Sequence, residues 1–383
     1  MNSPLSHRRS TNLCATFASI LTAASLVVLL ANVRAETLPN TPDNTTPNTP
    51  DNVRPVPQPS TAPSSTTPAI PLPPANPSPP VQQENGRPIW GVYVGNDTKG
   101  TEIPAHEKWF GRPTDAILAY TGDANWQDYD GCTGWAMGIW RKADRRVLWS
   151  VAFIPRGASL AEAAKGAYNS HWKKIAEQLA TWRPEEPLLY IRTAWEFNGD
   201  WFHYNSIKQP KEFIGAWRQF VSTFRSVSGR FRFDWCPSGG TGHVEEAYPG
   251  DDYVDIIGLD LYDQYRWCKI KDPAERWDKV ALHGDHTLLW HKAFAAEHHK
   301  PMSYPEWGVG GAESGDDPYF VEHMHQWFID NHVIYATYWD SDSAYKGRLS
   351  SNQYPLSSAK YKELFGNPSE ANPSGSKTAL DSK

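Results

Sequence analysis

The sequence predicts a (β/α)8 TIM barrel, an α/β fold in which eight parallel strands alternate with helices, and two observations lead to this prediction. Between residues 87 and 366, short apolar, β-branched or aromatic runs alternate with longer amphipathic stretches, which is typical of βα units around a parallel sheet. Eight such runs occur, and eight is the number of strands that closes a barrel of this kind. The same alternation leaves an open doubly wound sheet as the alternative.

The predicted strands are bounded by turn residues and are rich in Val, Ile, Tyr, Phe and Trp. In chain order they cover residues 89–95, 116–122, 147–155, 188–197, 231–237, 254–262, 301–309 and 333–340.

Helical patterns lie between the later strands. Residues 159–182 open with Ser159 and carry Glu162 three positions later, the spacing of a capping box, and the segment 211–227 repeats apolar residues at helical intervals. Residues 276–299 and 318–331 follow the same pattern. The stretches before the second and third strands are weakly patterned, so the helices there are the least defined part of the prediction.

The segments outside the barrel have a different composition. Residues 1–35 combine a basic start, an apolar run at 14–31 and small residues before Glu36, as a cleaved signal peptide does, although the run is also near the length of a membrane anchor. Residues 36–86 form a Pro/Thr-rich linker expected to be disordered, because such a sequence buries too little apolar area to offset its ordering entropy. Residues 367–383 are predicted to be a disordered polar tail. The expected location is secreted or periplasmic.

Charge and cysteine content exclude several classes. A net charge of −6 without a basic stripe argues against a nucleic-acid partner. Beyond the leader three cysteines remain, at positions 132, 236 and 268, and an odd number at irregular spacing makes neither a disulfide framework nor a zinc site. We expect Cys236 to be a buried thiol and leave open a bridge between Cys132 and Cys268. The histidines lack HExxH spacing, so no metal or cofactor is predicted.

Aromatic residues are unusually dense in the predicted barrel, which contains all 18 tryptophans. They serve as core filler, and in an exported protein they also suit sugar rings, whose C–H faces stack on indole.

Two carboxylates stand at the carboxyl ends of predicted strands, where barrel active sites lie. Glu196 ends the fourth strand and Glu306 ends the seventh. Such a pair suits glycoside hydrolysis, with one group as acid and base and the other as nucleophile, about 5 Å apart in a retaining enzyme. The aromatic neighbours Trp195, Phe197 and Trp201 should raise the pKa of Glu196, so that it holds a proton near neutral pH while Glu306 stays ionised. The alternative is two unrelated acids, each bonded to an arginine or a helix cap.

Four segments carry a family resemblance. They are RTAWEFNGDWF (192–202), WCPSGG (235–240), YPGDDYVDIIGLDLYD (248–263) and KPMSYPEWGV (300–309). In this order they resemble the acid/base motif, the end of strand 5, the strand 6 segment and the nucleophile strand of glycoside hydrolase family 26, the β-mannanase family of the (β/α)8 clan A. The similarity covers most of residues 87–345.

The resemblance implies a retaining mechanism with Glu196 as general acid/base and Glu306 as nucleophile. Tyr262 matches the family tyrosine that donates a hydrogen bond to the nucleophile. Trp339, at the end of the eighth strand, matches the aromatic platform beneath the sugar that is cleaved.

Further residues are assigned to substrate binding. Arg192 shares the strand parity of the acid/base, so its guanidinium should lie beneath the site and hold the carboxylates. Asn198, Trp201 and Phe202 are expected to line the acceptor side, with loop packing as the alternative. Trp235 opens the segment that resembles the end of strand 5 and is included with them.

The chain departs from the family pattern beside the acid/base. Trp195 replaces the histidine that helps to bind sugar at the cleavage position, and we assign it to substrate binding. Thr193 and Phe197 replace a proline and a methionine. Because the catalytic pair remains, we predict an endo-β-1,4-mannanase-like hydrolase, with a β-glucan, a xylan or a bacterial exopolysaccharide as alternative substrates. A noncatalytic carbohydrate-binding protein is the alternative from another class. The expected partner is a polysaccharide, and we expect a monomer.

Overall fold

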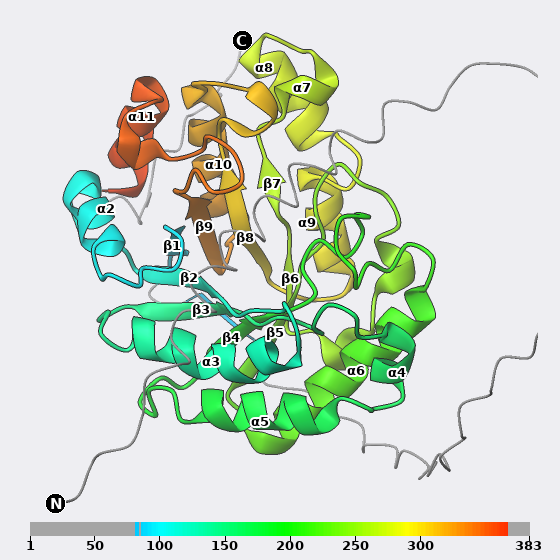
Figure 1. Ribbon diagram of the computed structural model, residues 1–383. Helices are drawn as coiled ribbons and strands as arrows, with labels where there is room; N and C mark the ends of the chain where they lie inside the picture. Colours follow the sequence, from blue (N-terminus) through cyan, green and yellow to red (C-terminus); the bar gives the residue numbers. More distant parts are fainter. Residues whose placement is uncertain (1–80, 84–85, 367–383) are drawn as a thin grey trace, which may run out of the picture.

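The computed structural model describes residues 81–83 and 86–366, and in this part of the chain every strand pairing is parallel (Figure 1). The strands are β1 (Ile89–Tyr93), β2 (Ala116–Tyr120), β3 (Arg146–Ser150), β4 (Leu189–Arg192), β5 (Phe231–Trp235), β6 (Ile256–Gly258), β7 (Leu261–Tyr262), β8 (Met302–Gly308) and β9 (Tyr335–Trp339).

The sheet closes on itself. Neighbouring strands follow the order β6-β5-β4-β3-β2-β1-β9-β8-β7, and a further pairing of β6 with β8 joins the two ends. Both β6 and β7 pair with β8, so they are two parts of one barrel strand interrupted at Leu259 and Asp260. Eight strand positions therefore form a closed (β/α)8 barrel, which confirms the predicted fold and all eight predicted strands.

Helices surround the barrel in the described residues (Figure 1). The α-helices are α2 (Glu102–Phe110), α3 (Trp126–Trp140), α4 (Leu160–Ala164), α5 (Asn169–Ala180), α6 (Pro210–Val227), α7 (Tyr265–Cys268), α8 (Pro273–Arg276), α9 (Leu288–Glu297), α10 (Pro318–Asp330) and α11 (Pro355–Phe365). A π-helix, η3 (Trp277–Leu282), continues α8. Short 3-10 turns are η1 (Glu245–Ala247), η2 (Asp251–Tyr253), η4 (Gly311–Glu313) and η5 (Leu349–Ser351).

Two of the four predicted helices are correct as continuous elements, and two are divided. The segments 211–227 and 318–331 correspond to α6 and α10. The predicted helix 159–182 is split into α4 and α5 because Gly166 adopts φ +81° between them. Ser159 occupies the N-cap position of α4, but its side chain makes no capping hydrogen bond, so the predicted capping box is wrong. The predicted helix 276–299 is likewise interrupted between η3 and α9.

The fourth strand is shorter than predicted. It ends at Arg192, and Glu196 lies in the turn that follows, not on the strand. The reason is the backbone: Ala194 and Glu196 have φ values of +48° and +52°, which a strand does not allow. The strand parity assumed to link Arg192 with Glu196 therefore does not apply.

Apolar side chains form two layers. One cluster fills the inside of the barrel and includes Tyr93, Leu118, Leu148 and Tyr335. The larger cluster packs the outside of the strands against the helices. In α6 its members stand at positions 213, 216, 217, 220, 221 and 224, the spacing of one helical face.

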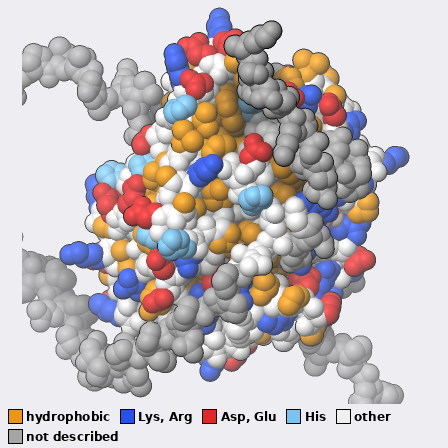
Figure 2. All heavy atoms as spheres, turned by 180° about the vertical axis from the view of Figure 1, so that it is seen from behind, with side chains coloured by type: hydrophobic (Ala, Val, Ile, Leu, Met, Phe, Trp, Pro, Cys, Tyr) orange, Lys and Arg blue, Asp and Glu red, His pale blue; other side chains and the backbone are white. Residues whose placement is uncertain are grey.

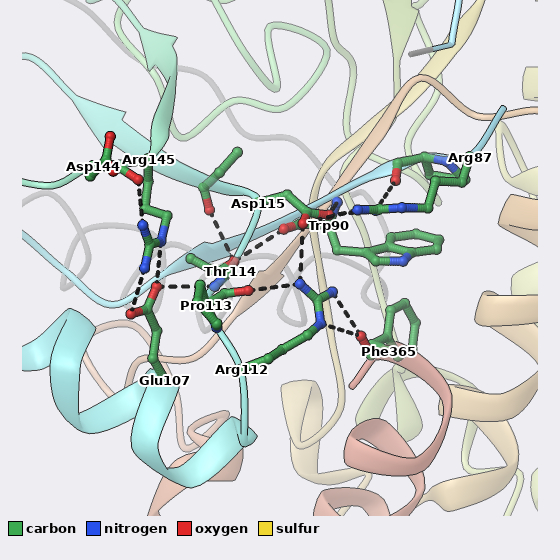
Figure 3. A network of polar contacts seen from close by, with 12 residues as sticks. Arg87, Trp90, Glu107, Arg112, Pro113, Thr114, Asp115, Asp144, Arg145 and Phe365 are labelled. Atoms are coloured by element: carbon green, nitrogen blue, oxygen red, sulfur yellow. Dashed lines mark hydrogen bonds and ion pairs between the residues drawn. The ribbon is translucent and has the colours of Figure 1, made fainter. Parts of the chain in front are cut away.

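Polar contacts tie the first and last elements together at the end of the barrel where β2 begins (Figure 3). The carboxylate of Asp115 accepts hydrogen bonds from Arg87 at 2.6 Å, from Arg112 at 3.1 Å and from the backbone N–H of Trp90 at 3.0 Å. Arg112 also donates to the carbonyl of Phe365 in α11 at 2.8 Å. This end of a barrel supports stability and lies opposite the strand ends that carry active sites.

The surface of the described residues carries mixed charge. On the face in Figure 2, Lys and Arg side chains are interspersed with Asp and Glu and form no continuous stripe of one sign. None of the helices between residues 81 and 366 has the length and apolar character needed to cross a membrane. The predicted signal segment with its anchor-like run, most of the linker and the tail lie outside the described residues.

Packing inside the barrel gives a stability prediction. A Cβ atom at Gly258 would lie 2.4 Å from Oδ1 of Asp234, whose carboxylate is held by Ser303 and Tyr335. Gly258→Ala should therefore lower the free energy of unfolding by about 1–3 kcal/mol through overpacking. At Gly138 in α3 a Cβ would meet no atom within 4 Å, so Gly138→Ala should be neutral or stabilise by up to about 1 kcal/mol. Equal thermal unfolding of the two variants would contradict this account.

Candidate active site

Side chains from several strand ends converge at the carboxyl end of the barrel. Tyr120, Arg192, Tyr262 and Trp339 are the last residues of β2, β4, β7 and β9, and Glu306 lies near the end of β8. Because all these strands are parallel, their carboxyl ends meet on one side of the barrel. The predicted nucleophile, its tyrosine and the arginine are therefore brought together.

Glu306 accepts hydrogen bonds from three side chains. Arg192 and Tyr120 donate to Oε1, and Tyr262 donates to Oε2 at 2.6 Å. The residue is 7% exposed. Three donors, one of them cationic, stabilise negative charge on this carboxylate and fix its orientation.

Arg192 is buried and shared between two acids. It donates to Asp260 at 3.0 Å and to Glu306, and its guanidinium lies over the rings of Trp195 and Tyr120 at 5.2 and 5.5 Å. A buried guanidinium needs such partners because its desolvation is unfavourable. The ring of Trp195 therefore packs against the guanidinium of Arg192, and it makes an edge-to-face contact with Tyr120 at a ring distance of 5.2 Å.

Glu196 reaches the site from a strained turn. Its backbone N–H donates to the carbonyl of Cys236 on the neighbouring β5 side at 2.8 Å, and its carboxylate accepts from Nε1 of Trp201 at 2.8 Å. A left-handed φ at a non-glycine residue is unfavourable and is often found at functional sites. Burial, and then the negative charge of Glu306, raise the pKa of Glu196 to about 7, although the hydrogen bond from Trp201 opposes the shift.

Two further acids of the site, Asp260 and Asp234, are buried and have raised pKa values. Burial raises the pKa of Asp260 well above its usual range, and the charge of Glu306 adds to this while Arg192 opposes it. Burial also raises the pKa of Asp234 to about 6. Among these acids, Glu306 accepts hydrogen bonds from the most side chains, namely Arg192, Tyr120 and Tyr262.

Most of the aromatic residues predicted to bind substrate lie around the two glutamates. Phe202 stacks on Tyr204 at a ring distance of 4.9 Å and meets Trp195 at 5.8 Å. Trp339 lies 4.1 Å from the ring of Tyr93. Trp201 and Phe202 are partly exposed, whereas Trp195 and Trp339 are each 5% exposed.

The structure does not bring Asn198 or Trp235 to the site. Asn198 is fully buried, and its amide donates to the carbonyls of Ser238 and Thr241 and accepts from the N–H of Ser238, so it clamps two loops together. Trp235 points out of the barrel and packs against Phe197 at 4.8 Å. On β5 it is Asp234 that faces inward, because side chains alternate along a strand.

Sequence reasoning missed Tyr120 and Tyr93. Both are the last residues of their strands, β2 and β1, and this position is the signal that identifies them. Burial, and then the charge of Glu306, raise the pKa of Tyr93 above its ordinary value, so its hydroxyl stays protonated and able to donate.

The cysteines of the described residues are not joined by disulfide bonds. Cys236 is a buried thiol that donates to Asp260 at 3.2 Å. Cys132 and Cys268 form no disulfide bond in the described residues, so the bridge left open between them is not formed. Within the described residues, no three His, Cys, Asp or Glu side chains are grouped as metal ligands.

The chain is similar to a family of glycosyl hydrolases and to two characterised relatives. Residues 158–288 match the model of glycosyl hydrolase family 26, a range that includes Glu196 and ends before Glu306. Endoglucanase H of Acetivibrio thermocellus is 21% identical over 289 residues, which are 72% of this chain and 30% of that protein. Mannan endo-1,4-beta-mannosidase A and B of Caldalkalibacillus mannanilyticus is 32% identical over 104 residues, 24% of this chain and 20% of that protein. The chain thus spans less than a third of either relative.

A solved structure has a similar fold. The modular endo-β-1,4-mannanase of Cellulomonas fimi aligns with a TM-score of 0.50 and 17% identity over 74% of this chain and 71% of that one. At this identity the likeness concerns the fold alone.

The environment of Glu196 predicts a measurable titration. In a carboxyl ¹³C NMR titration Glu196 should titrate near pH 7. Glu306→Gln removes a like charge and should lower the pKa of Glu196, whereas Trp201→Phe removes a donor to its ionised form and should raise that pKa. A pKa near the ordinary value of 4.5, or shifts of opposite sign, would contradict the described contacts.

Proposed function

The chain carries a glycosyl hydrolase family 26 domain, and from this premise we propose that it is a retaining hydrolase of a β-linked polysaccharide. The observation that carries the proposal is the unequal environment of two acids at the carboxyl end of the barrel, Glu196 in the turn after β4 and Glu306 near the end of β8. Glu196 has a pKa of about 7 and holds a proton, while Glu306 accepts hydrogen bonds from Arg192, Tyr120 and Tyr262. An acid and a nucleophile need these two environments.

In the first step, Glu306 attacks the anomeric carbon and forms a glycosyl ester while Glu196 gives its proton to the leaving oxygen. The ester no longer carries the negative charge that raises the pKa of Glu196. Glu196 then favours the ionised form and can take a proton from water. The water attacks the anomeric carbon of the ester, which releases the sugar and the carboxylate of Glu306 and leaves Glu196 protonated again. Tyr262 and Arg192 keep Glu306 oriented throughout.

The first substrate to consider is a β-1,4-mannan, and the proposed action is endo. The family resemblance and the 32% identical mannosidase segment support it. Trp195 argues for wider testing, because an indole supplies fewer polar contacts than the histidine of the family pattern. The relative named as an endoglucanase supports a β-glucan as the second candidate, and xylans and bacterial exopolysaccharides complete the set.

The mechanism predicts a defined pattern of loss. With the polymer that the wild type cleaves, Glu306→Ala should show no turnover, and Glu196→Gln should lower kcat/KM by about 10²–10⁴-fold. The first product observed by proton NMR should retain the anomeric configuration. Glu177→Gln, an exposed change on α5, is the matched control and should leave activity unchanged.

Each contrary outcome has a distinct meaning. An inverted first product would exclude Glu306 as nucleophile. If no polymer is cleaved but a glycan binds wild type and Glu306→Ala equally, the protein is a carbohydrate-binding module.

We also propose export to the periplasm or the medium, on the strength of the signal-like segment at residues 1–35. Intact mass of the protein recovered from its own cells should give Glu36 as the first residue. Recovery in the membrane fraction with residues 14–31 retained would instead identify an anchor.

A further inference from the structure

A buried carboxylate near the candidate active site lacks close partners. Asp123 lies three residues beyond the end of β2 and is 4% exposed. The nearest cationic atoms are Nε of Arg156 at 3.7 Å from Oδ1 and Nδ1 of His203 at 3.9 Å from Oδ2. Both distances exceed a hydrogen bond, whereas a carboxylate this buried ordinarily accepts several.

The loop does not need this carboxylate for its shape. The backbone carbonyl of Asp123 accepts from the N–H of Arg156 at 2.7 Å, and the next residue, Ala124, donates its N–H to the carboxylate of Asp128 at 3.0 Å. His203 is held separately, because its Nε2 lies 3.0 Å from the carbonyl of Ile154. The carboxylate of Asp123 thus has two long ion pairs, and its oxygens can still accept short hydrogen bonds from a ligand.

The cluster of Asp123, Arg156 and His203 lies on the side of the general acid. Its members come from the loops after β2, β3 and β4, and His203 shares a loop with Glu196. Glu306 and its donor Tyr262 lie on β8 and β7, which the strand order separates from β2–β4 on both sides. Tyr120 of β2 and Arg192 of β4 also reach Glu306, so strand order alone does not place the sugar that becomes bonded to it. Because Glu196 gives its proton to the leaving oxygen, the leaving sugar lies on the side of the loop that Glu196 shares with His203.

The side chains of the cluster suit hydroxyl groups. On the Arg156 side, a hydroxyl about 2.8 Å from both atoms can bridge the gap, donating to the carboxylate while the guanidinium N–H donates to the hydroxyl oxygen. On the His203 side, Nε2 donates to the carbonyl of Ile154, so Nδ1 of the neutral ring is an acceptor, and a second hydroxyl can donate to Oδ2 of Asp123 while Nδ1 accepts from a neighbouring hydroxyl. Arg156 and His203 have side-chain exposures of 49% and 25%, so the cluster is open to a ligand.

We propose that Asp123, flanked by Arg156 and His203, binds two adjacent hydroxyl groups of the leaving sugar. This inference rests on the proposed function. It makes Asp123 a specificity-determining residue: a backbone sugar with both hydroxyls free is accepted, and one with a substituent on either hydroxyl is excluded.

Two substrates distinguish a role of Asp123 in binding the leaving sugar from a purely structural role. The first is the polymer that the wild type cleaves, and the second is a dinitrophenyl β-glycoside with the same sugars on the Glu306 side and no leaving sugar. Asp123→Ala should lower kcat/KM on the polymer by about ten- to a hundredfold, the effect of losing charged hydrogen bonds. On the aryl glycoside, kcat/KM should stay within about twofold.

Two further variants complete the design. Asp123→Asn keeps the shape of the side chain but loses the charge and one acceptor, so its loss on the polymer should be smaller than that of Asp123→Ala. Asp130→Ala is the matched control, because Asp130 makes a shorter contact, 2.7 Å, with His171 between helices α3 and α5. It should leave both substrates unaffected.

The outcomes are distinguishable. Equal losses on polymer and aryl glycoside, or no loss on either, would overturn the assignment of Asp123. If the wild type cleaves neither substrate, the proposed function itself fails, and this inference fails with it.

Discussion

Burial of the Arg192 guanidinium is the constraint on which the rest of the barrel mouth depends. A cation inside a barrel is unfavourable unless acids and oriented dipoles surround it, and here Asp260, Glu306, the Tyr120 hydroxyl and two aromatic rings do so. The same contacts fix the orientation of Glu306. One guanidinium therefore serves two carboxylates, while burial raises the pKa of Glu196 and of Asp260.

Glu196 and Glu306 carry the same functional group, but their different surroundings give them different chemistry. Glu196 meets an indole N–H and the repulsion of a nearby charge, so its pKa rises to about 7. Glu306 meets three donors. Desolvation by aromatic side chains strengthens both effects, since charges interact more strongly where water is excluded. The density of Trp and Tyr therefore contributes electrostatically as well as to packing.

The turn after β4 shows how a strained backbone is maintained at such a site. Positive φ values at Ala194 and Glu196 are unfavourable, and surrounding contacts must hold them. The N–H of Glu196 is bonded to Cys236, and the amide of Asn198 makes three hydrogen bonds to the loop after β5. Within the segment 192–202, some polar and aromatic residues, such as Trp201, face the site, and others, such as Asn198, stabilise the turn.

The sequence by itself determined the eight strands, the barrel and the two glutamates, because strand hydrophobicity is local and the carboxyl end of a parallel strand is a fixed place in this fold. It also identified Arg192, Tyr262 and Trp339 through strand ends and family resemblance. Only the tertiary structure decided where Asn198, Trp235 and Tyr120 lie relative to the two glutamates. Whether a side chain faces the site depends on the exact residue at which a strand stops, which local patterns give only approximately. It also depends on contacts between residues far apart in the chain, such as Tyr120 with Glu306, which local patterns do not contain.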